Sequence, residues 1–104
     1  MYVVMYSFKV KPKQELAFLD SWRALTKLIY EYEGSLGSRL HKKNALHYIA
    51  YAQWPNKTVF EAAGDKLPKE ANIYQDLMRI SCEEIEVLEK FEVIEDLIKQ
   101  KPYG

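Results

Sequence analysis

Hydrophobic residues follow two different periods along this chain, and each change of period marks the boundary of an element. Residues 2–10 and 46–54 are rich in aromatic and aliphatic side chains, which is typical of β-strands. From Phe18 to Tyr32 apolar side chains recur at steps of four and three residues, which indicates an amphipathic helix. In chain order the pattern predicts a strand at 2–10, a helix at 14–33, strands at 36–42 and 46–54, a short helix after Asn56, a helix from Pro68 and a strand at 83–95.

Residues that break regular structure stand where these elements should end. Pro12 follows the first strand, Gly34 follows the long helix, and Lys43-Asn44 is the predicted turn between the second and third strands. The order β-α-β-β-α-β is the split βαβ, or ferredoxin-like, arrangement, an α+β fold with an antiparallel sheet and helices on one face. The chain shows no repeat and no linker, so we expect a single domain over residues 1–104.

Both faces of this predicted sheet carry apolar side chains, although its helices cover one face. In the third strand Tyr48 and Trp54 point one way while Ile49 and Tyr51 point the other, and Met5 repeats the pattern in the first strand. An uncovered four-stranded face has an area on the order of 500 Å². Patches of that size usually mark an interface. The sequence therefore predicts a homodimer built sheet to sheet.

Charge and cysteine content narrow the class of protein further. The chain has 15 basic and 15 acidic side chains, so it has no long-range field to attract nucleic acid, and we expect no nucleic-acid partner. No run of residues approaches the length of a membrane span, and the first residues do not resemble a secretion signal. The single cysteine, Cys82, fits a reducing compartment, so we expect a cytoplasmic protein.

The last predicted strand is strongly acidic. We interpret these carboxylates as a charged edge that discourages further strand pairing. The alternative is that they meet Arg39, Lys42 or Lys43 across the dimer. The acidic residues are Glu83, Glu84, Glu86, Glu89, Glu92, Glu95 and Asp96.

One segment carries a resemblance to a known family. Residues 34–54 contain Gly37-Ser-Arg-Leu-His41 and end in Tyr51-Ala-Gln-Trp54, and the polar turn into a helix, Pro55-Asn-Lys-Thr-Val-Phe-Glu61, follows. This segment resembles the antibiotic biosynthesis monooxygenase-like family, and a weaker match extends over nearly the whole chain. The resemblance implies a ferredoxin-like dimer with an α+β barrel between the subunits.

The resemblance also implies a chemistry. Members of this family include cofactor-independent quinol and polyketide monooxygenases, so we expect a monooxygenase that acts without a cofactor on a small hydrophobic or aromatic molecule. The haem-degrading branch fits less well, because Ser7 stands where that branch has asparagine and residues 55–82 contain no histidine. The alternative function is a dimeric module of the same fold that binds a small ligand without transforming it.

Seven residues are the candidates for this site. As catalytic residues we consider Trp54, which the family pattern places beside a pocket, and Tyr48 or His41, which could relay a proton. For each of them a structural role is the alternative: a core anchor for Trp54, a packed ring for Tyr48 and an exposed turn residue for His41. The candidate substrate-binding residues are Arg39, Tyr51, Trp22 and Ser7.

Each substrate-binding candidate has a structural alternative as well. Arg39 could form an ion pair instead of holding an anionic substrate, and Trp22 could belong to the core. Tyr51 and Ser7 could be ordinary strand residues. His41 and His47 have no cysteine beside them and lack the spacing of metal ligands, so we expect no metal site.

Overall fold

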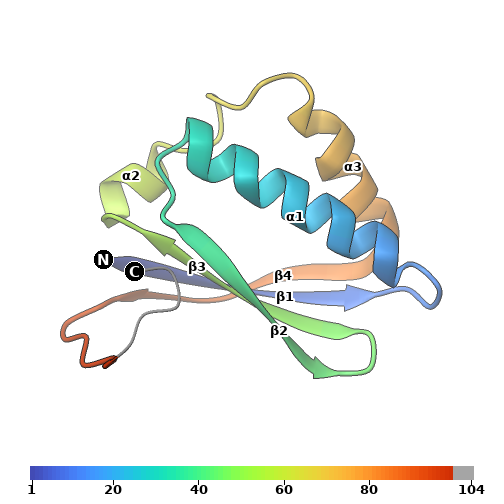
Figure 1. The fold of residues 1–104 in the computed structure, drawn as a ribbon, viewed down its shortest axis with the longest axis horizontal. Helices are drawn as coiled ribbons and strands as arrows, with labels where there is room; N and C mark the ends of the chain where they lie inside the picture. The colour runs from blue at the N-terminus through green and yellow to red at the C-terminus, as the bar shows by residue number, and fades with distance from the viewer. Residues whose placement is uncertain (100–104) are drawn as a thin grey trace.

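The structure is a computed structural model, and it describes residues 1–99. Its sheet has the strand order β2-β3-β1-β4, with β1 and β3 in the centre and antiparallel pairing throughout (Figure 1). This order confirms the predicted α+β, ferredoxin-like fold. The elements are β1 Tyr2–Val10, α1 Glu15–Tyr32, β2 Gly37–Asn44, β3 His47–Trp54, α2 Lys57–Glu61, α3 Ala71–Ser81 and β4 Cys82–Glu92.

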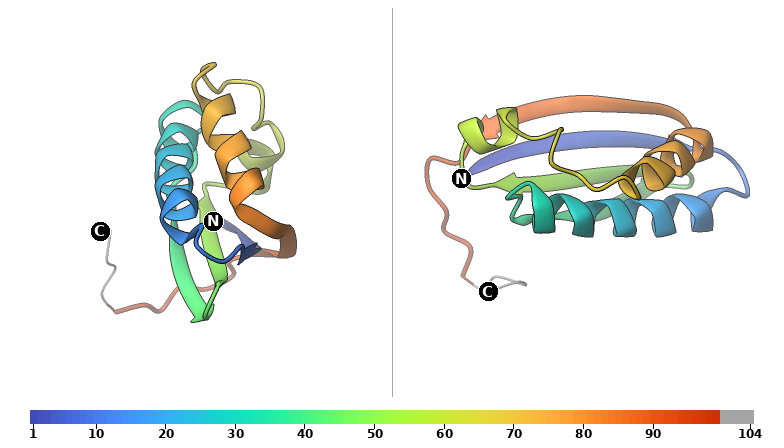
Figure 2. Two further views of the ribbon diagram at one scale, coloured as in Figure 1. Left: turned by 90° about the vertical axis from the view of Figure 1, so that its right-hand side faces the viewer. Right: turned by 90° about the horizontal axis from the view of Figure 1, so that it is seen from above.

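All three helices lie on the same side of the sheet. Figure 2 shows α1 and α3 side by side over the strands, with the short helix α2 beyond the end of β3. No helix within residues 1–99 covers the opposite side, which we call the open face. None of the described helices is long and apolar enough to cross a membrane.

The core lies between the helices and the sheet. Phe18 of α1 is completely buried and packs against Phe8 of β1 and Tyr48 of β3, with ring centroids 5.1 and 5.3 Å away. Val4 is also completely buried, and it joins the second cluster around Trp54. These are the residues that strand alternation and helix periodicity direct toward each other.

Two predicted boundaries are wrong. Lys43 and Asn44 belong to β2, and the turn consists of Ala45 and Leu46. A register irregularity between Lys42 and Asn44 adds a residue to β2 and thereby moves the turn along the chain. Leu46, expected to begin the third strand, instead adopts a left-handed φ of 65° in the turn, and its carbonyl accepts the N–H of Val10.

The third helix and the last strand also differ from their predicted limits. Pro68 lies in the turn before α3. Its carbonyl accepts the N–H of Ala71, the residue at which α3 begins. The strand β4 starts at Cys82 and ends at Glu92, so Glu95 and Asp96 lie beyond it. Cys82 is buried, and this burial raises the pKa of its thiol, which does not favour a nucleophilic role.

The open face has apolar side chains at its centre and charged ones toward its edges. Strand pairing places Met5 of β1 and Ile49 and Tyr51 of β3 on it. Val3 and Ser7 of β1 also belong to this face and are buried in the single chain. Since Ser7 is polar, the face is less uniformly apolar than the sequence pattern predicts, and its apolar part follows the two central strands.

Candidate functional site

A cavity of about 200 Å³ lies between α1, α3 and the sheet, and we call it the inner cavity. Strand alternation places Ala50 and Ala52 of β3 on its floor, where their short side chains leave space beneath α1. Most of its wall is apolar or aromatic, as in most small-molecule sites. It is lined by Tyr6, Phe8, Trp22, Leu25, Thr26, Ile29, Ser35, Ser38, Ala50, Ala52, Trp54, Met78 and Ile85.

Trp54 lines this cavity at the end of β3. Its side chain is 4% exposed, and its ring packs edge-on against Phe60 of α2 with centroids 5.4 Å apart. The helix α2 begins here because the side chain of Asn56 accepts the N–H of Val59 at 2.9 Å, a regular N-cap. The cap and the helix hold the indole in place.

The indole N–H of Trp54 has no hydrogen-bond partner. Among the buried side-chain nitrogen and oxygen atoms of residues 1–99, it is the one that remains unsatisfied. A buried donor without an acceptor costs about 1–3 kcal/mol, so proteins seldom retain one. An acceptor on a bound molecule would remove this cost.

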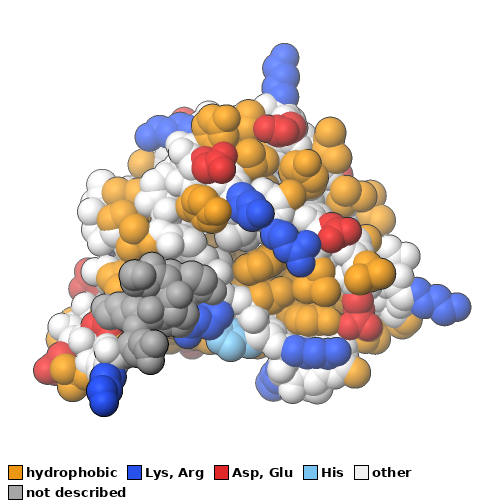
Figure 3. Space-filling model, viewed as in Figure 1, with side chains coloured by type: hydrophobic (Ala, Val, Ile, Leu, Met, Phe, Trp, Pro, Cys, Tyr) orange, Lys and Arg blue, Asp and Glu red, His pale blue; other side chains and the backbone are white. Residues whose placement is uncertain are grey.

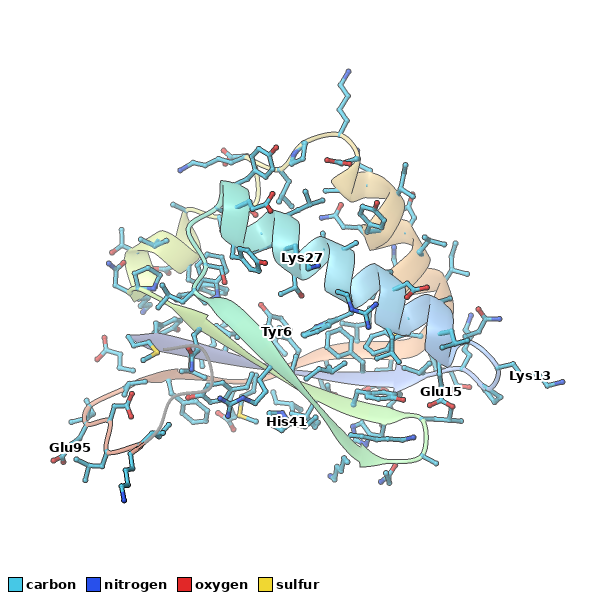
Figure 4. All side chains as sticks on the ribbon, in the orientation of Figure 1. Tyr6, Lys13, Glu15, Lys27, His41 and Glu95 are labelled. Atoms are coloured by element: carbon cyan, nitrogen blue, oxygen red, sulfur yellow. The ribbon has the colours of Figure 1, made fainter. Side chains whose placement is uncertain are left out.

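A second hollow of about 380 Å³, the outer groove, opens beside the inner cavity along β2. Trp22, Thr26, Ser35 and Ser38 line both, so the two hollows adjoin each other. Figure 3 shows basic side chains next to hydrophobic surface on this face of the molecule, and Figure 4 locates Lys27 on α1 and Tyr6 beneath it. The groove is lined by Trp22, Arg23, Thr26, Lys27, Tyr30, Ser35, Leu36, Gly37, Ser38, Arg39, Tyr51 and Gln53.

The two serines shared by both hollows are held by the backbone. Ser35 donates its hydroxyl hydrogen to the carbonyl of Gln53 at 3.2 Å and accepts the N–H of Gly37 at 3.0 Å. Ser38 donates to the carbonyl of Tyr51 at 3.1 Å. With their hydrogens in use, these hydroxyls offer acceptor oxygens to a ligand, which complements the unused donor of Trp54.

The seven candidates separate into three groups. Trp54 and Trp22 line the inner cavity, and Trp22, Arg39 and Tyr51 line the outer groove. Tyr48, His41 and Ser7 line neither. Trp54 and Trp22 thus meet at the inner cavity, whereas Arg39 and Tyr51 pair with each other on the open face and border the groove at the edge of the sheet. The roles of all four stay predictions.

Tyr48 lies on the helix side of the sheet, but its hydroxyl is engaged elsewhere. It donates to a carboxylate oxygen of Glu15 at 2.6 Å, and Lys42 lies 3.7 Å from the same oxygen. The hydrogen bond to Glu15, followed by burial, raises the pKa of Tyr48. Lys42, which the sequence pattern offered as a partner for acids across a dimer, has an acidic partner within its own chain.

Replacing Tyr48 with phenylalanine is expected to lower the free energy of unfolding by about 1–3 kcal/mol, because a hydrogen bond to a charged group is lost. The raised pKa means that the folded state holds this proton more tightly than the unfolded state. The stabilisation is therefore complete below pH 10 and disappears as the pH rises through the folded-state pKa.

Urea unfolding of both proteins at pH 8 and near pH 11 measures this effect. The difference between wild type and Tyr48→Phe should shrink at the higher pH. Tyr32→Phe, on the exposed side of α1, is the matched control and should behave as wild type. A difference that stays constant with pH would contradict the assignment.

His41 and Ser7 lie on the open face. The Nδ1–H of His41 donates to the carbonyl of Ile49 at 3.1 Å, and the ring is exposed. Ser7 shares a hydrogen bond of 2.7 Å with Nε2 of His47. The sheet separates all three side chains from the inner cavity. No group of three or more potential metal ligands occurs within residues 1–99.

Several residues that line the inner cavity were not among the site candidates from the sequence. They include Tyr6, Ser35, Ser38 and Met78. The alternation of the first strand already placed Tyr6 on the same side as Phe8, and that signal could have found it. Burial raises the pKa of Tyr6, which makes it a poor proton donor to solvent and a poor base at neutral pH. No pattern in the sequence indicated the two serines, because their position depends on the loop between α1 and β2.

Solved structures of the same fold cover nearly the whole chain. SnoaB, described as a cofactor-independent oxygenase from Streptomyces nogalater, is 14% identical, with a TM-score of 0.75 over 94% of this chain and 97% of its own. A protein from Mycobacterium tuberculosis is 9% identical, with a TM-score of 0.70 over 92% and 97%. A conserved protein from Bacteroides thetaiotaomicron is 19% identical, with a TM-score of 0.66 over 88% and 97%. At these identities the likeness shows the fold.

The sequence itself gives one family match. Residues 1–65 match the family described as antibiotic biosynthesis monooxygenase. This range includes β1, α1, β2, β3 and α2, and therefore most of the walls of both hollows. None of the curated proteins is detectably similar to the chain in sequence.

Proposed function

Because the chain belongs to the antibiotic biosynthesis monooxygenase family, we propose that it oxidises a quinol-like or polyketide aromatic molecule with molecular oxygen and without a cofactor. An anthrone CH₂ would become C=O, or a quinol would become a hydroxyquinone as one ring C–H becomes C–OH, and in both cases the second oxygen atom would leave as water. All electrons would come from the substrate, so no external reductant is needed. The likeness to SnoaB supports the proposal at the level of the fold.

The observation that carries the proposal is the unsatisfied N–H of Trp54 beside an apolar cavity. Deprotonation of a quinol or anthrone places negative charge on its oxygen, and an electron-rich anion of this kind can reduce oxygen itself. The N–H would donate to that oxygen and stabilise the developing charge. The apolar walls would exclude water from the anion, which strengthens the hydrogen bond.

The subunits would pair through their open faces. Support comes from the apolar side chains along the central strands, among them Met5, Ile49 and Tyr51, on a face without a covering helix. Burying on the order of 500 Å² per subunit at ~25 cal/mol per Å² would contribute roughly 12 kcal/mol per subunit before association costs. Since helices and cavity lie on the other side, each subunit would keep its own site.

The unpaired, buried Cys82 suits a reducing, cytoplasmic setting.

Oxygen consumption with a panel of quinols and anthrones tests the proposed reaction. We expect turnover above the rate of spontaneous oxidation, unchanged by a chelator and by removal of flavin. Mass spectrometry with ¹⁸O₂ should show one labelled oxygen atom in the product. Rates equal to the uncatalysed reaction across the panel would refute a monooxygenase of this type.

A second function, binding without chemistry, is favoured by one observation. Among residues 1–99, Tyr6 is the one titratable side chain that lines the inner cavity, and because burial raises its pKa it stays protonated at neutral pH and does not accept a proton there. A substrate that does not deprotonate readily would therefore be bound and left unchanged. Thermal stabilisation by ligands that the protein never transforms would indicate this binding module.

A further inference from the structure

The outer groove differs from the inner cavity in its charge. Two cations of α1, Arg23 and Lys27, line it, and no acidic side chain is among the lining residues. The whole chain has equal numbers of acidic and basic residues, so this concentration is local. A concave surface with charges of one sign favours a ligand of the opposite sign.

We propose that the natural ligand is an aromatic acid, whose flat ring occupies the inner cavity and whose carboxylate lies in the outer groove against these cations. The inference rests on the proposed function for the identity of the site, and it adds the charge of the ligand. The two hollows adjoin each other at Trp22, Thr26, Ser35 and Ser38, and the proposed ligand would extend from one into the other.

Helix geometry explains how α1 serves both parts of the site. Trp22 and Thr26 are four residues apart and form a row that faces the sheet, while Arg23 and Lys27 form the adjacent row, one residue further along. The first row lines both hollows and the second row lines the outer groove alone. Charge and apolar surface are therefore adjacent but separate, as an amphipathic ligand requires.

The opposite wall is the edge strand β2. It begins at Gly37, whose φ of 105° suits glycine, and the space where a Cβ would stand is empty to a radius of 4 Å. Two residues later Arg39 borders the groove, but it pairs with Tyr51 and precedes His41 by two positions, so strand alternation directs its side chain to the open face. A carboxylate in the groove would therefore meet its cations, Arg23 and Lys27, on the α1 wall.

The neighbouring acid does not neutralise the groove. Asp20 lies 3.3 Å from Arg23, but both side chains are more than half exposed, and exposed pairs of this kind contribute little and exchange readily. Asp20 itself is not among the residues that line the groove. A bound carboxylate could therefore share Arg23 with it.

Calorimetric titration with two matched probes tests the proposal. The probes are 1-hydroxy-2-naphthoate and 1-naphthol, which share a two-ring phenol and differ in the carboxylate. We expect the acid to bind at least about fivefold more tightly at low ionic strength, as one or two partly exposed ion pairs would give. We expect added salt to reduce its affinity and to leave that of the neutral probe unchanged.

Two variants locate the effect. Lys27→Gln and Arg23→Gln should each weaken binding of the acid by about two- to fivefold and leave 1-naphthol unaffected. Lys13→Gln is the control, because Lys13 lies in the loop after β1, away from the groove (Figure 4). Equal affinity for the two probes, no measurable binding of the acid, or a preference that both groove variants retain would overturn the proposal.

This test does not depend on turnover. If the acid is preferred but no quinol is oxidised, the proposed charge of the ligand is supported and the proposed monooxygenase reaction is refuted. If quinols are oxidised but the acid is not preferred, the proposed reaction is supported and the proposed ligand class is refuted.

Discussion

Trp54→Phe is expected to lower kcat/KM for the aromatic substrate by about 10- to 100-fold, close to the loss seen when one donor to a developing oxyanion is removed. Phenylalanine retains an aromatic ring against Phe60 and removes the indole N–H, the one buried side-chain donor of residues 1–99 that lacks a partner. Stability should change little. The lost ring area is destabilising, whereas removing an unsatisfied N–H recovers about 1–3 kcal/mol.

Steady-state oxygen uptake and urea unfolding of the same preparations separate the two effects. Trp22→Phe provides the matched control: it removes an indole from the same cavity, from a half-buried position on α1. We expect it to raise KM more than it lowers kcat. Wild-type turnover by Trp54→Phe would show that the indole N–H takes no part in the reaction.

Ile49→Asp is expected to convert a dimer into a monomer. Ile49 lies at the centre of the open face, opposite Ser7 of β1 and His41 of β2 in the strand register. A carboxylate buried there without a cationic partner would cost several kcal/mol, so the dissociation constant should rise by at least about 100-fold. Sedimentation at micromolar concentration should show twice the subunit mass of 12.3 kDa for wild type and 12.3 kDa for the variant.

Two further variants show whether loss of the dimer results from the change on the open face or from unfolding of the subunit. Phe91→Asp alters the open face at a residue of β4 that is already 45% exposed in the single chain, so it should dissociate the dimer without unfolding the subunit. Ile73→Asp, on the exposed side of α3, should leave the mass unchanged. A wild-type protein that sediments as one subunit would refute pairing through the open face.

Most of the fold was predictable because hydrophobic residues recur at the regular spacing of a helix or a strand in most of its elements. The stripe from Phe18 to Tyr32 and the alternation in β1 and β3 identified the central strands and the long helix to within one or two residues. The β2–β3 turn was misplaced because an irregular residue lengthens β2, and Leu46 takes a left-handed conformation that favours glycine or asparagine. Composition does not reveal a bulge.

The site was predictable only in part, for a related reason. Trp54 and Trp22 belong to regular elements and line the inner cavity, and Arg39 and Tyr51 border the outer groove from β2 and β3. Tyr48 faces the same side of the sheet, yet its hydroxyl is held by Glu15, 33 positions away in sequence. Alternation gives the face of a side chain, but it does not give the partner that the side chain finds there.

Strand β3 supplies the floor of the inner cavity with Ala50, Ala52 and Trp54 and supplies the open face with Ile49 and Tyr51. A shift of this strand by a single position would exchange the two sets at once. Relatives that lengthen or shorten the preceding hairpin should therefore do so by two residues at a time, or add a compensating bulge, so that the proposed site and the proposed pairing face are preserved together.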